Sequence, residues 1–153
     1  MIYKILIGLA ALFGLFRLFR MTDTFAKAIL IGQISAIGLT LLFENVLMTI
    51  GFLLYTVTLV LIMIYGLKTT FTNTFIKLLI IVPSFFIFTL HVFQQQHFPG
   101  TKLLGFTMIL PLVAYLILLL KCRGNLKNEF GFITIITVDA FIEFLMRIEW
   151  IMN

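Results

Sequence analysis

Six apolar runs of roughly 20 residues fill most of this chain, and a run of that length is what a helix needs to cross a bilayer. The 153 residues are 62% hydrophobic and 11% charged, whereas soluble domains are about 45–50% apolar and about 25% charged. The runs are continuous, while strands of a small membrane barrel alternate polar and apolar residues. The sequence therefore predicts helices at residues 2–19, 25–43, 46–67, 75–93, 103–120 and 130–151.

These runs predict an all-α fold: a polytopic transmembrane helical bundle of about six helices in a single domain, residues 1–153. The first run resembles a signal peptide, but Arg17 and Arg20 follow it in place of a small-residue cleavage site, so we expect it to remain as the first helix. The last run also allows a second arrangement, with five spanning helices and one helix that lies in the membrane interface.

Positive charges are distributed unevenly between the two sides of such a bundle. Cytoplasmic loops of membrane proteins are enriched in Lys and Arg. We therefore expect an inner (cell) membrane protein with its odd-numbered loops in the cytoplasm, and the net charge of +5 reflects topology rather than nucleic-acid binding. The odd loops and adjoining helix ends hold Arg17, Arg20, Lys27, Lys68, Lys77, Lys121, Arg123 and Lys127, and the other side holds Lys4, Lys102 and Arg147.

Three charged residues, Asp139, Glu143 and Arg147, lie four apart in the last run and so share one stripe of a helix. A charge at mid-bilayer costs about 2.5–3.5 kcal/mol on insertion scales. Glu143 and Arg147 can pair, which leaves Asp139 to protonate, meet water or pair with a basic residue on another helix or protein. The stripe is the leading candidate site, either for helix contacts or for a proton or cation. An interfacial helix anchored by Trp150 is the alternative.

Two further features concern helix packing. Pro83 and Pro111 lie at similar depth in neighbouring helices and free the carbonyls of Leu79 and Thr107, which predicts either ordinary kinks or a cavity wall. Small residues recur at every fourth position of the second helix, where another helix of this subunit or of a second copy can approach closely. They are Ala28, Gly32, Ala36 and Thr40.

Signatures of enzymes and metal sites are weak. His91 and His97 lie six residues apart, unlike a helical metal pair at i,i+4, and no carboxylate stands near them in the sequence. We expect a helix-end histidine and a loop histidine, no metal and no cofactor. The single Cys122 excludes an internal disulfide and a zinc site built on several cysteines. Serine–histidine, paired-acid and glycine-rich phosphate patterns are missing, so the sequence predicts no enzyme.

A six-residue motif occurs at residues 22–27 and again at 72–77, with four of six positions identical. Both copies begin a helix from the same side of the bundle. Shared N-capping by Thr, Asp or Asn oxygens explains the likeness, and a duplicated helical hairpin is the alternative.

Residues 12–20, Leu-Phe-Gly-Leu-Phe-Arg-Leu-Phe-Arg, with the next loop and the helix before Glu44, resemble the two-helix membrane subunit of the gliding-motility and type 9 secretion motor. His-Phe-Pro-Gly at 97–100, followed by an apolar helix, is similar to that family's histidine–aromatic–Pro–Gly loop. The family carries a carboxylate inside its second helix, where this chain has Gln33 and Ser35. The resemblance implies a related lineage of small envelope proteins that lacks this carboxylate.

These observations predict a small integral membrane protein, an accessory or structural subunit of a membrane complex. Its partners would be the lipid bilayer and other membrane proteins or a second copy of itself, with no nucleic acid. The alternative is a small transporter or channel with a proton or cation site at Asp139 and Glu143. A transporter needs a wet path to Asp139, whereas a subunit needs a partner's cation against it.

Overall fold

The computed structural model describes residues 2–44, 46–68, 74–121 and 126–152, and these residues form helices joined by turns, which confirms the predicted all-α fold. Four long helices come first: α1 (Ile2–Leu18), α2 (Thr24–Leu42), α3 (Val46–Lys68) and α4 (Thr74–Gln95). A composite helix follows, made of α5 (Thr101–Leu104), a 3-10 turn (η1, Gly105–Met108) and α6 (Ile109–Lys121), and α7 (Phe130–Met152) completes the bundle.

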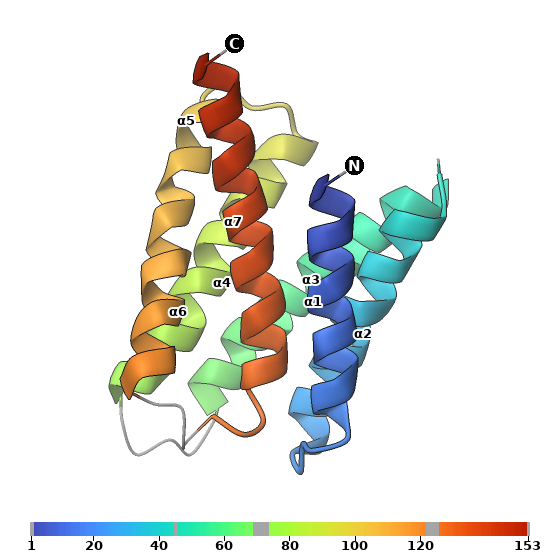
Figure 1. Ribbon diagram of the computed structural model, residues 1–153, viewed down its shortest axis with the longest axis vertical. Helices are drawn as coiled ribbons and strands as arrows, with labels where there is room; N and C mark the ends of the chain where they lie inside the picture. Colours follow the sequence, from blue (N-terminus) through green and yellow to red (C-terminus); the bar gives the residue numbers. More distant parts are fainter. Residues whose placement is uncertain (1, 45, 69–73, 122–125, 153) are drawn as a thin grey trace.

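The helices run alternately up and down, so that both chain termini lie toward the same end of the bundle (Figure 1). Helix α7 packs against α1, α2, α4 and α6, although it carries the charged stripe. One long face of α7 is therefore buried within the bundle, and whether this helix spans the membrane or lies in the interface stays a prediction. Helices α2, α3 and α4 are each long and apolar enough to cross a membrane. Many large apolar side chains are exposed on the outside of the bundle, as in a membrane protein.

Small residues bring α2 and α3 close together. A Cβ atom added at Gly32 would lie 2.8 Å from Cγ2 of Thr58, and one added at Gly51 would lie 2.9 Å from the carbonyl oxygen of Ala36. The close contact therefore joins two helices of one chain. Ala28 was expected to share it but is exposed, because a four-residue repeat drifts by about 40° per step around a helix of 3.6 residues per turn.

The two prolines lie in neighbouring helices, Pro83 in α4 and Pro111 in α6, and both are buried. Helix α4 continues through Pro83. The chain before Pro111 instead forms the 3-10 turn η1, because a proline cannot donate a hydrogen bond to the carbonyl of Thr107. Neither proline lines the two cavities at the candidate site described below.

Side-chain oxygens hold the turn between α1 and α2. Oδ1 of Asp23 accepts a hydrogen bond of 2.9 Å from the backbone N–H of Ala26, which confirms N-capping at the first copy of the repeated motif. Oδ1 of Asn128, just before α7, accepts bonds from the backbone N–H groups of Thr22 and Asp23. In the second copy, residues 72 and 73 lie outside the described residues.

Candidate functional site: a polar cluster between α3, α4 and α7

The stripe on α7 faces the interior of the bundle. The side chains of Asp139, Glu143 and Arg147 are only 18%, 11% and 17% exposed. Ala140, beside them on α7, is fully buried. In such surroundings a charge without a partner lowers stability, because the protein interior solvates a charge less well than water does.

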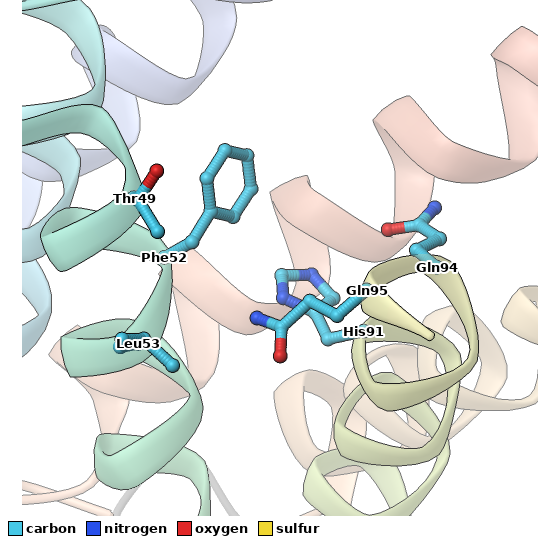
Figure 2. A pocket seen from close by; sticks show the side chains of 6 residues that line it. All are labelled: Thr49, Phe52, Leu53, His91, Gln94 and Gln95. Atoms are coloured by element: carbon cyan, nitrogen blue, oxygen red, sulfur yellow. The ribbon is translucent and has the colours of Figure 1, made fainter. Parts of the chain in front are cut away.

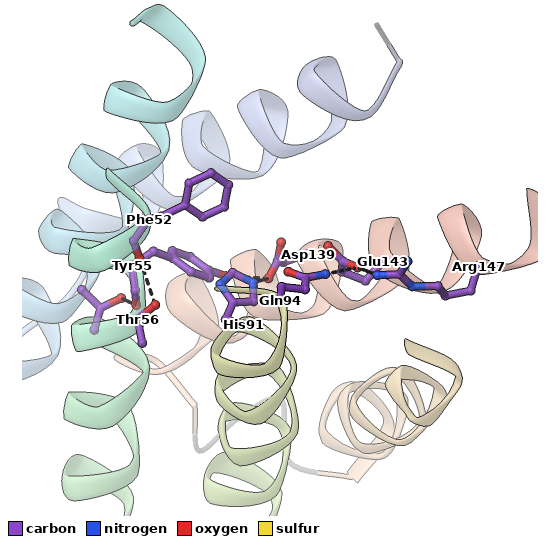
Figure 3. Close-up of polar contacts among 9 residues, drawn as sticks. Phe52, Tyr55, Thr56, His91, Gln94, Asp139, Glu143 and Arg147 are labelled. Carbon is purple, nitrogen blue, oxygen red and sulfur yellow. Dashed lines mark hydrogen bonds and ion pairs between the residues drawn. The ribbon is translucent and has the colours of Figure 1, made fainter. Parts of the chain in front are cut away.

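Asp139 contacts side chains from two other helices. Its Oδ2 atom accepts a hydrogen bond of 3.3 Å from the hydroxyl of Tyr55 on α3, and it lies 3.3 Å from Nε2 of His91 on α4 (Figure 3). The rings of Tyr55 and His91 lie together, with centroids 5.3 Å apart. Of the three outcomes expected for Asp139, the structure thus shows pairing across helices. No carboxylate lies near His91 in the sequence, but folding brings Asp139 of α7 against it.

Glu143 is paired within its own helix and also with α4. Its Oε2 atom accepts a hydrogen bond of 3.0 Å from Arg147, the i,i+4 ion pair that the sequence predicts, and one of 2.9 Å from Nε2 of Gln94 (Figure 3). Both bonds involve a charged group and are therefore stronger than neutral ones. Glu143 is held in place by these two partners.

The contact with Asp139 indicates which nitrogen of a neutral His91 carries the proton. A carboxylate can only accept hydrogen bonds, so in the neutral imidazole Nε2 carries the proton and Nδ1 is left as an acceptor. The His91 side chain is 6% exposed, and its Nδ1 atom is buried with no hydrogen-bond partner among the residues that the structure describes. His91 therefore keeps one unused acceptor in the interior.

A cavity of about 430 Å³, called here the outer cavity, lies between α3 and α4. Figure 2 shows His91 projecting from α4 and Phe52 projecting from α3 into this space. The cavity has apolar walls and several uncharged polar groups. Its lining residues are Thr49, Phe52, Leu53, His91, Gln94 and Gln95.

A second, smaller cavity of about 60 Å³, the inner cavity, adjoins Asp139. Phe52 and His91 line both cavities and so stand between them. The inner cavity is large enough for water and offers the hydrogen-bonding groups that an ordered water requires. Its lining residues are Ile7, Ala36, Thr40, Phe52, Tyr55, His91 and Asp139.

A separate polar contact lies at the opposite end of the bundle. Glu129, which precedes α7, is 3% exposed and accepts a hydrogen bond of 2.7 Å from the hydroxyl of Tyr65. Burial raises the pKa of Glu129, and the bond from Tyr65 opposes this shift in part. This contact joins the start of α7 to α3.

Sequence reasoning missed three residues of the cluster: Tyr55, His91 and Gln94. One signal was present, because His91 and Gln94 lie three apart in an apolar run and so share a helix face. His97, by contrast, lies in the turn after α4. Gln33 is fully buried on α2, and its amide atoms have no partner among the described residues.

Comparisons with protein families, with characterised proteins and with solved structures find no match for this chain. Within the part of the chain that the structure describes, no group of three His, Cys, Asp or Glu side chains is arranged to hold a metal ion. The fold and the site thus define an all-helical protein with three helices that are long and apolar enough to cross a membrane, and with a buried polar cluster. Any statement of function has to come from this cluster.

Proposed function

We propose that this protein is a small multi-pass membrane transporter that couples transport to the binding and release of a proton at His91 and Asp139. The observation that carries the proposal is the buried contact of 3.3 Å between His91 Nε2 and Asp139 Oδ2, beside two cavities. Ionisable residues within apolar helices mark pathways of protons and ions in membrane proteins. A histidine takes up a proton in the range of about pH 5 to 8 more readily than any other side chain.

The two carboxylates of the stripe have different roles in this proposal. Glu143 is compensated by Arg147, which is always charged. For Asp139, the partners are Tyr55 and His91, of which only His91 can change its charge near neutral pH. One added proton therefore takes the His91–Asp139 pair from a net negative charge to neutrality, and such a change in an apolar interior can bias the packing of helices.

The cavities support a transporter over a purely structural helix contact. The outer cavity reaches His91, and the inner cavity reaches Asp139. Both cavities adjoin the His91–Asp139 pair, so water or a small solute can approach the pair, which a purely structural contact would not need.

We further propose an inner-membrane location with the odd-numbered loops in the cytoplasm, on the strength of the charge bias in the sequence. His91 lies four residues before the end of α4, which is about 6 Å along the helix axis. In this orientation the outer cavity lies in the half of the bundle that faces away from the cytoplasm.

An accessory subunit of a membrane complex is the competing proposal. It was motivated by an Asp139 that needs a cation from a partner. With His91 and Tyr55 against this carboxylate, the stripe no longer calls for an outside cation. Only the apolar helices still support an accessory subunit, and these helices suit a transporter equally well.

The test measures proton movement across the membrane of proteoliposomes loaded with a protein-free small-molecule extract of the expressing cells. The outside medium is acidified, and a pH dye inside the vesicles reports the proton movement. We expect the wild type to move protons and Asp139→Asn to fail. Glu149→Gln is the matched control, since it neutralises an exposed acid of the same helix. Proton movement by Asp139→Asn at the wild-type rate contradicts the proposal. No movement by the wild type, together with lost co-purification of partners in Asp139→Asn, favours the subunit.

A further inference from the structure

The carboxylates of α7 fix the orientation of two polar groups at the outer cavity. A carboxylate only accepts hydrogen bonds, so Glu143 accepts one of 2.9 Å from Nε2 of Gln94. The carbonyl oxygen of Gln94 is thereby turned the other way, on the side of the outer cavity (Figure 2). By the same rule Asp139 takes the N–H of His91 and leaves Nδ1 as a buried, unused acceptor. In the wall of the outer cavity, Gln94 and His91 therefore offer acceptors to a ligand that donates, beside the Gln95 amide and the Thr49 hydroxyl, which can donate as well as accept.

The charges behind this wall favour a cation. Asp139 lies against His91, and Glu143 lies against Gln94. Arg147 offsets one of the two carboxylates, and it lies beyond Glu143 along α7, on the side away from His91 (Figure 3). With His91 neutral, these groups have a net charge of one negative unit. The surrounding protein screens the electric field of this charge less than water would.

The remaining walls suit an apolar body. Phe52 and Leu53 line the side formed by α3, and the face of an aromatic ring also attracts cations. The volume of about 430 Å³ falls in the range of cavities that hold small organic molecules. Leu53 is 53% exposed, so the outer cavity opens at the surface of the bundle.

We propose that the outer cavity binds a small organic molecule with an apolar body and a primary ammonium group, and that this molecule exchanges against a proton at His91. The inference rests on the proposed function, because the exchange uses the same His91–Asp139 pair. The ammonium group donates to Nδ1 of His91 and to the carbonyl oxygen of Gln94, and its apolar body lies along Phe52 and Leu53.

The exchange is balanced in charge and in protons. A proton that binds Nδ1 turns this acceptor into a donor and places a positive charge where the ammonium group bound. The ammonium leaves with all its own protons, so one positive charge enters as another departs. The other titratable and charged groups that face His91 are Tyr55, Asp139 and Glu143, the last paired with Arg147, and they are occupied by the contacts given above.

The ligand class is tested by calorimetry on the full chain in detergent at about pH 8, where a free histidine is neutral. The three probes share a phenyl ring: phenethylammonium, its trimethylammonium analogue and 3-phenylpropanoate. Because the analogue keeps the charge but has no N–H, we expect it to bind about tenfold more weakly than phenethylammonium, and 3-phenylpropanoate more weakly still. Equal or tighter binding of either one overturns the proposal.

The location is tested by filling the outer cavity. Leu53→Trp should weaken phenethylammonium binding at least about tenfold. Leu47→Trp is the matched control on the same helix, since Leu47 is 41% exposed and lies outside the cavity lining. Unchanged binding by Leu53→Trp overturns the site, and so does an equal loss in both variants.

The exchange is tested by pH. Phenethylammonium keeps its charge between about pH 8 and about pH 5.5, so its binding should weaken on acidification as His91 gains a proton. Affinity that does not change over this range overturns the exchange. Failure of the proposed function looks different: proton movement then persists in Asp139→Asn while phenethylammonium still binds. If phenethylammonium does not bind although Asp139→Asn stops proton movement, the inference alone fails.

Discussion

A double-mutant cycle on His91 and Asp139 measures how much their contact stabilises the bundle. His91→Leu leaves a buried carboxylate without its partner, a loss that typically costs about 3–5 kcal/mol. The hydroxyl of Tyr55 remains and Asp139 is 18% exposed, so we expect the lower end, about 3 kcal/mol. Asp139→Leu leaves a buried N–H on His91, which costs about 1–3 kcal/mol.

The double variant should be far more stable than the sum of these losses predicts, because two apolar side chains replace a buried polar pair. We expect a coupling free energy of at least about 2 kcal/mol. The measurement is unfolding of the purified chain by increasing SDS in mixed micelles, followed by helical circular dichroism. His97→Asn, in the turn after α4, is the control and should leave stability unchanged, because Asn tolerates the left-handed backbone of this position (φ 52°). Strictly additive losses would refute the reasoning, since the two side chains would then not interact.

Three further predictions concern other parts of the molecule. Gly51→Ala should lower stability by about 1–3 kcal/mol through overpacking against α2. Gly38→Ala is the control, because a Cβ atom there meets nothing within 4 Å. Equal melting temperatures of the two variants would contradict the close contact between α2 and α3. Cys122 should react with a membrane-impermeant thiol reagent only after cells are opened, and labelling in intact cells reverses the proposed orientation. Since burial raises the pKa of Glu129, its contribution to stability is complete below its unfolded pKa and is lost as pH rises through the folded value. Glu129→Gln should therefore melt at the wild-type temperature near about pH 4 and above it at neutral pH, and a gap that does not widen with pH argues against a buried charge.

The helices could be predicted from the sequence because each is a continuous apolar run bounded by polar or turn residues. The first capping residue, Asp23, and the ion pair of Glu143 with Arg147 were also predictable, since both depend on neighbours within one helical turn. The composite helix around Pro111 was foreseen only as a kink. The 3-10 turn before it depends on how η1 packs against α7 as well as on the proline.

The candidate site could be predicted only in part. The spacing of Asp139, Glu143 and Arg147 identified one wall of the cluster, but Tyr55, His91 and Gln94 come from helices whose rotation about their axes is set by packing. Apolar runs that are hydrophobic on all sides do not reveal which face turns inward. The pairing of His91 with Asp139 required the observed position of α7 beside α4.

The central claim is that His91 holds its proton on Nε2 against Asp139 and gains a second proton on Nδ1 when the medium is acidified. Nitrogen-15 NMR of the full chain in bilayers, labelled at histidine, observes both ring nitrogens directly. The chain has two histidines, so His97→Gln leaves the signals of His91 alone. We predict a protonated Nε2 and an unprotonated Nδ1 at about pH 8, with both nitrogens protonated at about pH 5. A proton on Nδ1 at the higher pH, or a ring that stays neutral at the lower pH, would contradict the account.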